Sequence, residues 1–277
     1  LRGGEAILSD PESSQFVSAL LMVAPHASGD VLLSVAGGLP SRPYVELTLH
    51  VMRQMGAEVL DGEHADGSLR FVVPAWQRYA AGAYPIEPDA SAATYFWAAA
   101  AISGGRACVR GLAPDSPQGD VNFVRVLERM GCGVRASDTG LEVAGPPAGG
   151  LRGIRVNLNA MPDTVQTLAV AALFAEGPTE ISDVANLRVK ETDRLAALAT
   201  ELRRFGARIE ERGAGLRIDP PVRLPREPVE VSTYDDHRMA MSFAIAGLRT
   251  PVRIREAACV GKSFPGFFEV LAEAVGG

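Results

Sequence analysis

The two lysines of this chain lie in short segments whose residue types are suited to binding an anion. Of the 27 basic residues only Lys190 and Lys262 are lysines, and all others are arginines. Arginine therefore fills nearly every position at which any cation suffices, whereas lysine supplies a compact ammonium group on a flexible stem. A bias of the coding sequence toward arginine would explain the same count without any function. The neighbours of the two lysines favour a functional explanation.

Lys190 lies in a segment, Asn186 to Arg194, that also contains Glu191. Lys190 and Arg194 are four residues apart, a spacing that predicts one face of a helix. A solvated charged face is the ordinary interpretation of such a run. However, the segments around His237 and Lys262 occupy equivalent positions in an internal repeat. The sequence thus indicates one cluster of four cations, suited to a substrate that carries phosphate and carboxylate: Lys190, Arg194, Arg238 and Lys262.

Two further segments place hydroxyl groups at expected helix starts. One is Ser13-Ser14-Gln15, and the other is Ser41-Arg-Pro-Tyr44. The N-terminus of a helix binds anions through its free N–H groups and its positive dipole end. A single serine at such a place is ordinarily an N-cap, but two hydroxyls and an amide exceed what one cap requires. We therefore expect these side chains to bind a phosphate.

An internal repeat of 75 residues must position these groups. Gly56, Gly131 and Gly206 are spaced 75 residues apart, and each follows an amphipathic run. Glycine is the usual residue just after the last turn of a helix, because the chain adopts a left-handed conformation there. Short alternating segments with glycine or aspartate turns follow each glycine and predict a β-hairpin.

Upstream of each amphipathic helix we expect a short strand, a polar cap, an alanine-rich helix and another strand. The four caps lie near Asp10, Asp89, Asp163 and Asp235. For Asp163, helix capping is by itself the commonest role. The repeated unit is therefore βαβαββ, with three complete copies and a fourth that ends after its second helix. A single module cannot bury both faces of its sheet, so we expect an α/β fold in which the modules gather with their alanine-rich helices inward.

Composition argues against several other classes of function. The apolar runs are shorter than the roughly 20 residues that span a bilayer, so we expect no membrane segment. A net charge of −6 argues against nonspecific binding to nucleic acid. The four histidines and three cysteines lack metal-ligand spacing, and no phosphate-binding loop precedes a lysine, so we expect no metal and no cofactor. The odd, widely spaced cysteines predict reduced thiols in a cytoplasmic protein.

Six motifs between Ser13 and Phe268 make the chain resemble a known enzyme family. In order they are Ser-Ser-Gln-Phe, Ser-Arg-Pro-Tyr, Asp-Ala-Ser-Ala-Ala-Thr-Tyr-Phe, Arg-Val-Lys-Glu-Thr-Asp-Arg-Leu, Tyr-Asp-Asp-His-Arg-Met-Ala-Met and Lys-Ser-Phe-Pro-Gly-Phe-Phe. This set is similar to that of EPSP synthase, 3-phosphoshikimate 1-carboxyvinyltransferase, an enolpyruvyl transferase of the shikimate pathway and chorismate biosynthesis. The resemblance implies transfer of the enolpyruvyl group from phosphoenolpyruvate to the 5-hydroxyl of shikimate 3-phosphate, with release of phosphate. It also implies two domains of three βαβαββ modules each, closing on the substrates.

The resemblance suggests a role for each matching residue. The shikimate phosphate would bind Ser13, Ser14, Ser41 and Lys190, and the ring and hydroxyls would bind Gln15, Tyr44, Asp163 and Asn186. Phosphoenolpyruvate would bind Gln15, Arg194, Arg238 and Lys262. The reaction needs a base near the attacking hydroxyl and an acid for the methylene carbon. We assign Asp163 as the base and Glu191 as the leading acid. Lys262 competes for the acid role and assists the leaving phosphate, and His237 is a supporting residue that orients its neighbours.

One large part of the family pattern is absent. The family begins with a Pro-Gly-Ser-Lys-Ser segment and later has Ala-Gly-Thr followed by an arginine, and neither occurs here; the chain also lacks an initial methionine. We therefore expect the C-terminal two-thirds of a family member, with the C-terminal part of one domain in residues 1–86. Residues 87–277 would hold most of the second, as two full modules and an incomplete third. Its partner would be the missing N-terminal segment of the same protein, and the complete protein would be a monomer.

Two alternatives remain open from the residues alone. A related transferase acting on UDP-N-acetylglucosamine shares the module but would need contacts for a uridine. A non-catalytic fragment would fold yet bind neither substrate. Because a lysine and an arginine of the family's phosphoenolpyruvate site are absent, we expect weak or no turnover from the isolated chain.

Overall fold

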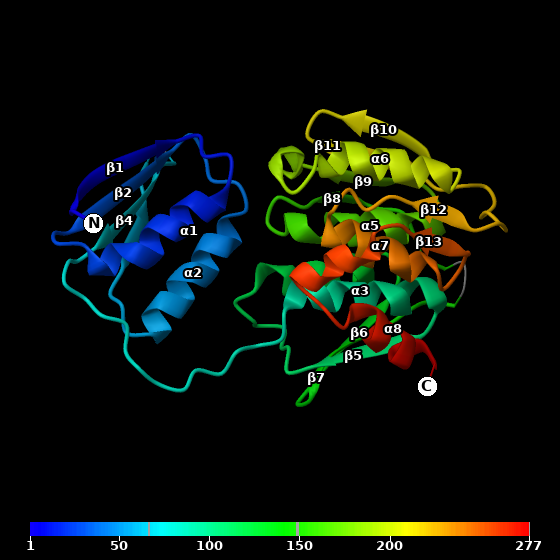
Figure 1. Ribbon diagram of the computed structural model, residues 1–277, viewed down its shortest axis with the longest axis horizontal. Coiled ribbons are helices and arrows are strands. Elements are labelled where there is room, and N and C mark those ends of the chain that lie inside the picture. Colours follow the sequence, from blue (N-terminus) through cyan, green and yellow to red (C-terminus); the bar gives the residue numbers. More distant parts are fainter. Residues whose placement is uncertain (66, 148–149, 277) are drawn as a thin grey trace. The chain divides into compact units, whose positions relative to one another are not determined.

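The computed structural model describes residues 1–65, 67–147 and 150–276, and the chain divides into two compact units (Figure 1). The first unit comprises Leu1–Ile86 with Pro117–Gly119, and the second comprises Glu87–Ser116 with Asp120–Gly277. No helix in the described part of the chain is both long and apolar enough to cross a membrane.

The first unit is one βαβαββ module. Its elements in order are β1 (Gly4–Ser9), α1 (Ser14–Val23), β2 (Val31–Ala36), α2 (Arg42–Gln54), β3 (Leu60–Glu63) and β4 (Leu69–Val73). The sheet order is β1-β2-β4-β3, with β1 parallel to β2 and the hairpin strand β4 antiparallel to β2. The two helices pack on each other and on the sheet through a separate apolar core that includes Val17, Leu21, Leu33 and Phe71.

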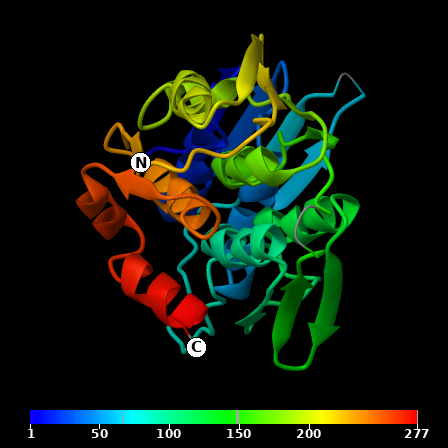
Figure 2. The same cartoon turned by 90° about the vertical axis from the view of Figure 1, so that its right-hand side faces the viewer.

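The second unit contains three further modules. The next module has α3 (Ala90–Ser103), β5 (Arg106–Arg110), α4 (Phe123–Arg129), β6 (Gly133–Ser137) and β7 (Gly140–Ala144). The third has β8 (Arg155–Asn157), α5 (Val165–Ala171), β9 (Thr179–Ser182), α6 (Arg194–Arg204), β10 (Arg208–Arg212) and β11 (Gly215–Asp219). The fourth has β12 (Val229–Val231), α7 (His237–Ala246), β13 (Val252–Ile254) and α8 (Phe267–Gly276). Figure 2 shows the yellow hairpin β10–β11 beside α6.

The second of the four modules lacks the opening strand that the sequence predicts, so this prediction is wrong. The segment between β4 and α3 forms no strand, and the sheet of this module has three strands in the order β5-β7-β6. Proline lacks the N–H that a sheet ladder requires, and the segment just before α3 contains Pro85 and Pro88. The third module, by contrast, pairs all four of its strands in the order β10-β11-β9-β8.

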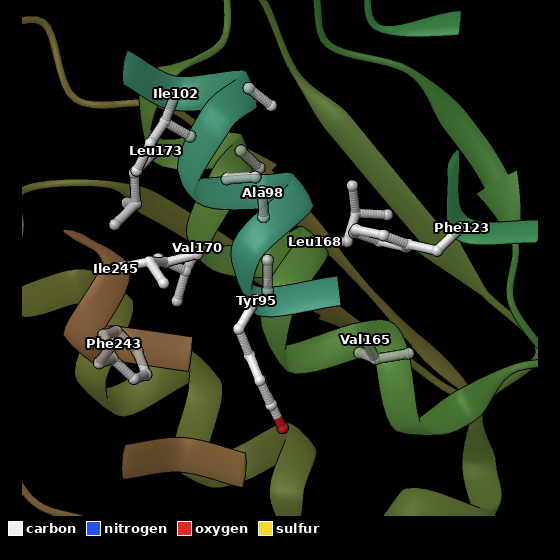
Figure 3. Close-up of a cluster of buried hydrophobic side chains, with 14 of the residues drawn as sticks. Tyr95, Ala98, Ile102, Phe123, Val165, Leu168, Val170, Leu173, Phe243 and Ile245 are labelled. Atoms are coloured by element: carbon white, nitrogen blue, oxygen red, sulfur yellow. The ribbon is translucent and has the colours of Figure 1, made fainter. Parts of the chain in front are cut away.

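The first helices of the three modules in the second unit pack together in one apolar core, as the sequence predicts. α3, α5 and α7 contact one another, and Tyr95, Leu168 and Phe243, one from each helix, belong to the buried cluster drawn in Figure 3. α3 is buried around most of its circumference, and the small side chain of alanine lets helix axes approach closely. Three hydroxyl groups also lie close together in this core. The Thr167 hydroxyl oxygen is 3.1 Å from that of Thr94 and 3.4 Å from that of Ser242.

The three repeated glycines end helices as expected. Gly56, Gly131 and Gly206 directly follow the C-caps of α2, α4 and α6, and their φ angles are +82°, +107° and +86°. A side chain in this left-handed region is strained, whereas glycine adopts it freely. The glycines thus fix the point at which each helix turns into its hairpin.

Candidate active site

The starts of α6 and α7 bring the predicted cationic residues of the second unit together. Arg194 is the first residue of α6 and Arg238 is the second residue of α7. Each helix is capped by an aspartate: Asp193 accepts from the amide of Ala196 at 3.0 Å, and Asp236 accepts from the amide of Arg238 at 2.8 Å. The caps therefore set where both arginine side chains leave the backbone.

The prediction that Lys190 and Arg194 share one face of a helix is wrong. Because Asp193 caps α6, the helix begins at Arg194, and Lys190 instead follows a short 3-10 segment, Ala185–Val189. Lys190 is half-buried and extended, and its positive charge still acts on Asp163. Asn186 lies within the same 3-10 segment and is half-buried.

The guanidinium of Arg194 is the centre of the site. Its side chain is only 2% exposed, and it contacts three carboxylates. Nε donates to Asp236 at 2.7 Å, Nη1 donates to Asp163 at 3.1 Å, and Nη2 donates to Glu191 at 2.7 Å. The planar fork of arginine suits this role, because its five N–H groups point in fixed directions.

Asp163 lies between two arginines. It belongs to the 3-10 turn Pro162–Thr164, and its second oxygen accepts from Arg238 at 2.9 Å while the first accepts from Arg194. Burial raises the pKa of Asp163, but the charges of Arg238, Arg194 and Lys190 outweigh burial and hold the pKa below its ordinary value. Asp163 is therefore a carboxylate at neutral pH, the protonation state that a base requires.

Glu191 bridges Arg194 and Lys262. Its two oxygens accept from Nη2 of Arg194 at 2.7 Å and from Nζ of Lys262 at 2.6 Å. Burial raises the pKa of Glu191, but the hydrogen bond from Lys262 and the charge of Arg194 outweigh it and lower the pKa to about 2. The Lys262 side chain is 58% exposed, whereas that of Arg194 is only 2% exposed. Without a ligand, Glu191 is thus ionised and has no proton to donate.

His237 lies directly between Asp236 and Arg238 in the chain and begins α7. Its side chain is buried, and Nδ1 has no hydrogen-bond partner among the described residues. Burial and the neighbouring charge of Arg238 lower the pKa of His237, so the imidazole is neutral at pH 7. The His237 ring is thus a neutral, packed group at the start of α7.

The predicted phosphate-binding residues of the first unit occupy the starts of its two helices. Ser13 caps α1 and accepts from the amide of Gln15 at 3.2 Å, Ser14 is buried, and Gln15 is exposed. Ser41 precedes α2 with a left-handed φ of 56° and is buried, and Tyr44 is half-buried one turn further. The structure thus places all five residues at the N-caps or in the first turns of α1 and α2.

Comparison with known proteins identifies the family. A family model described as EPSP synthase (3-phosphoshikimate 1-carboxyvinyltransferase) matches residues 1–271. The chain belongs to this family. The motif-based resemblance and the expected enolpyruvyl transferase fold are confirmed by this match and by the relatives that follow.

Named relatives match nearly the whole chain. The 3-phosphoshikimate 1-carboxyvinyltransferase of Photobacterium profundum is 46% identical over 275 residues, which cover 99% of this chain and 62% of the relative. The chloroplastic protein of that name from Brassica napus is 48% identical over 278 residues, covering 98% of this chain and 53% of the relative. A solved EPSP synthase from Acinetobacter baumannii superimposes with a TM-score of 0.76 at 26% identity, covering 99% of this chain and 63% of that one. The chain therefore spans 53–63% of the length of these family members.

Two residues at this site did not emerge from the sequence as site residues. Asp236 is fully buried, caps α7 and pairs with Arg194, although its sequence neighbours had drawn attention only to His237 and Arg238. Tyr95 lies on α3 with its hydroxyl 3.5 Å from Nη1 of Arg238, and burial raises the pKa of this hydroxyl to about 12. The consecutive aspartates before a helix were a usable signal for Asp236. Nothing in the sequence distinguishes Tyr95 from a core aromatic.

The site combines three cationic side chains with two ionised carboxylates. Arg194, Arg238 and Lys262 supply positive charge, and Asp163 and Glu191 are carboxylates that touch these cations directly. An anion that bound here would compete with both carboxylates for the same N–H donors. Among the residues that the structure describes, no group of His, Cys, Asp and Glu side chains gathers as a metal site would require.

Proposed function

We propose that this chain carries the base, the acid and the anion-binding cations for transfer of an enolpyruvyl group from phosphoenolpyruvate to the 5-hydroxyl of shikimate 3-phosphate. Family membership supports the reaction. The observation that carries the assignment is the convergence of two ionised carboxylates, Asp163 and Glu191, on one buried guanidinium, that of Arg194. Membership of this family also favours the shikimate acceptor over a UDP-sugar.

The proton steps follow from the charges. The 5-hydroxyl oxygen attacks C2 of phosphoenolpyruvate and passes its proton to Asp163, whose lowered pKa keeps it ionised and available. The methylene carbon receives a proton from Glu191 or Lys262, giving a tetrahedral intermediate. The C2–O bond to phosphate then breaks, and the leaving phosphate takes the proton held by Asp163. The methyl group returns a proton to the residue that supplied it, so that the C2=C3 double bond forms and the enol ether results. The Lys262 side chain is 58% exposed, so its ammonium group can stay in contact with the phosphate as it leaves.

Glu191 can serve as the acid only after it has taken up a proton. Its pKa of about 2 results from Lys262 and Arg194 overcoming burial. A dianionic phosphate or a carboxylate of the substrate competes for those cations. When this substrate group binds the two cations in place of Glu191, burial becomes the main influence on Glu191 and raises its pKa. We therefore propose that phosphoenolpyruvate binding itself loads Glu191 with its proton.

The hydroxyl-bearing helix starts of the first unit would bind shikimate 3-phosphate in this proposal. Ser13, Ser14 and Ser41 would hold the phosphate together with Lys190, and Gln15, Tyr44 and Asn186 would contact the ring. The position of the serines at the first turns of α1 and α2 supports this assignment, because free N–H groups gather there. The predicted cytoplasmic location and monomeric state of the complete protein belong to the same proposal.

Binding of phosphoenolpyruvate to the chain, measured by isothermal titration calorimetry, tests the cationic cluster. Arg238→Gln should weaken binding at least tenfold, because it removes a charged donor that is only 13% exposed. Arg106→Gln is the matched control, since Arg106 is an exposed residue of β5 in the same unit. If both variants lost affinity equally, or neither lost any, the proposal that Arg238 binds phosphoenolpyruvate would be wrong.

Phosphate release tests the reaction. Because the chain spans 53–63% of the relatives' lengths, we expect weak or no turnover from it alone. It should be assayed together with the part of the Photobacterium profundum relative that it does not match. Release that requires shikimate 3-phosphate and is lost in Asp163→Asn supports the proposal. Release driven instead by UDP-N-acetylglucosamine would show a different acceptor, and no release from a folded complex would show a non-catalytic fragment.

A further inference from the structure

Another buried carboxylate, that of Glu201, lies on α6 two turns after Arg194. Its side chain is fully buried, and three donors satisfy it. Oε1 accepts from the hydroxyl of Tyr234 at 2.8 Å, while Oε2 accepts from the amide of Ser232 at 3.3 Å and pairs with Nε of Arg204 at 3.1 Å. Two of these three donors belong to one turn, Ser232 to Asp235, which leads into α7.

That turn is strained. Tyr234 and Asp235 are adjacent non-glycine residues that both have a φ of 56°. The left-handed region is costly for residues with a side chain, and such conformations persist only where surrounding contacts enforce them. The hydrogen bonds from the turn to Glu201 are such contacts. Without them the turn would relax toward an ordinary backbone conformation.

Two residues of the candidate site, Asp236 and Arg238, directly follow the strained turn. Asp236 follows it immediately, with its amide bonded to the carbonyl of Thr233 at 3.0 Å, and its carboxylate reaches Nε of Arg194 at 2.7 Å. The same carboxylate accepts from the amide of Arg238 and so sets the start of α7. A change of the turn would therefore alter the position of Asp236 first and of Arg238 with it.

Helix α6 thus holds the turn at two points. Arg194 in its first turn binds the carboxylate that follows the turn, and Glu201 two turns later binds the turn itself. We infer that Glu201 is a positioning residue: through the Tyr234 hydroxyl it enforces the left-handed turn that presents Asp236 and Arg238 to the anion-binding site. The consequence for phosphoenolpyruvate rests on the proposed function, whereas the consequence for the Arg194–Asp236 contact does not.

The variant that tests this role is Tyr234→Phe. Glu201→Leu would remove the acceptor of all three donors at once, so its effect would not be specific to the turn. Tyr234 is partly exposed, so loss of its hydroxyl removes one hydrogen bond and leaves the core intact. Thr250→Val is the matched control, because it deletes another tertiary hydrogen bond of the second unit, the 2.6 Å bond from the Thr250 hydroxyl to the carbonyl of Pro225.

Two measurements separate positioning from mere stability. The first is the ¹H–¹⁵N NMR signal of the Arg194 Nε–H, which reports its bond to Asp236 in the ligand-free protein. Tyr234→Phe should shift or broaden this signal, and Thr250→Val should not. The second is the dissociation constant of phosphoenolpyruvate well below the unfolding temperature, which Tyr234→Phe should raise on the order of fivefold. An unchanged Arg194 signal in Tyr234→Phe would overturn the inference.

A rescue variant tests whether strain in the turn is the link. Glycine adopts the left-handed region without cost, so Asp235→Gly added to Tyr234→Phe should restore the Arg194 signal and the affinity. A double variant that stays as impaired as Tyr234→Phe would contradict the inferred mechanism. If the wild-type chain does not bind phosphoenolpyruvate while Tyr234→Phe still changes the Arg194 signal, the proposed function fails and the positioning role stands.

Discussion

Replacing Arg194 by methionine should destabilise the second unit severely at neutral pH. Methionine keeps an unbranched side chain of similar length, but it removes the only group that contacts Asp163, Glu191 and Asp236 together among the described residues. Removing one partner of a buried ion pair typically costs about 3–5 kcal/mol, because a buried charge is left uncompensated. We expect a loss of this size in the free energy of unfolding at pH 7.

The penalty should shrink as the pH falls. In the wild-type protein the pKa values of Asp163 and Glu191 are lowered, that of Glu191 from 4.5 to about 2. Their pairing therefore stabilises the fold above the ordinary carboxylate pKa, and this contribution is lost as the pH falls toward the lowered values. Without Arg194, burial keeps the carboxylate pKa values higher, so the variant relieves its repulsion by protonation sooner. The difference between the two proteins should be largest near pH 7 and much smaller near pH 3.

Urea unfolding followed by tryptophan fluorescence provides the assay. Trp97 is buried in the second unit, whereas Trp76 is 79% exposed in the first, so a Trp76→Phe background isolates the second unit. Arg106→Met is the control: its side chain is 75% exposed and lies 3.7 Å from Glu142, so about 1 kcal/mol or less is expected. A penalty for Arg194→Met that equals the control, or that stays constant from pH 7 to pH 3, would refute the electrostatic argument.

Three other predictions concern single positions. Phosphoenolpyruvate binding should be accompanied by proton uptake, seen by calorimetry in buffers of different ionisation enthalpy, and Glu191→Gln should abolish that uptake. Gly206→Ala should lower the free energy of unfolding by about 1–2 kcal/mol, because φ there is +86°, whereas Gly62→Ala, which meets no atom within 4 Å, should not. Gln166→Met should raise the thermal unfolding temperature, because both polar atoms of the buried Gln166 amide have no hydrogen-bond partner among the described residues; an unchanged or lower temperature would contradict this.

Most of the modular fold follows from local sequence signals. The glycine spacing of 75 residues marks the helix ends because only glycine adopts the left-handed conformation there freely, and Gly56, Gly131 and Gly206 all do so. The alanine-rich helices are buried because a helix that is apolar all round has no solvent face. The opening strand of the second module was predicted wrongly, because the repeat was extended over a segment whose prolines cannot complete a ladder.

The sequence indicated which residues belong to the candidate site better than it indicated which of them contact one another. Module equivalence indicated that Arg194, Arg238 and Lys262 belong together, and each contacts a carboxylate of the same cluster. The start of α6 was predicted too early in the chain. Asp193 caps the helix, so α6 begins at Arg194, and the four-residue spacing of Lys190 and Arg194 does not lie on one helix. Contacts such as Asp163 to Arg238 join residues 75 positions apart, and no local pattern reveals them.

The balance of charge explains why the three carboxylates around Arg194 have different roles. Asp236 is fully buried and bound through both oxygens, so a ligand cannot displace it, and it keeps Arg194 oriented whether or not the site is occupied. Asp163 and Glu191 are partly exposed, and in the proposed function an anionic substrate competes with them for their cations. An incoming phosphate therefore replaces their charge rather than adding to it. In the proposed function the resident carboxylates have already offset the cost of burying the cations. Displacement of Glu191 from these cations raises its pKa, so that Glu191 takes up a proton when phosphoenolpyruvate binds, while Asp163 stays ionised as the base.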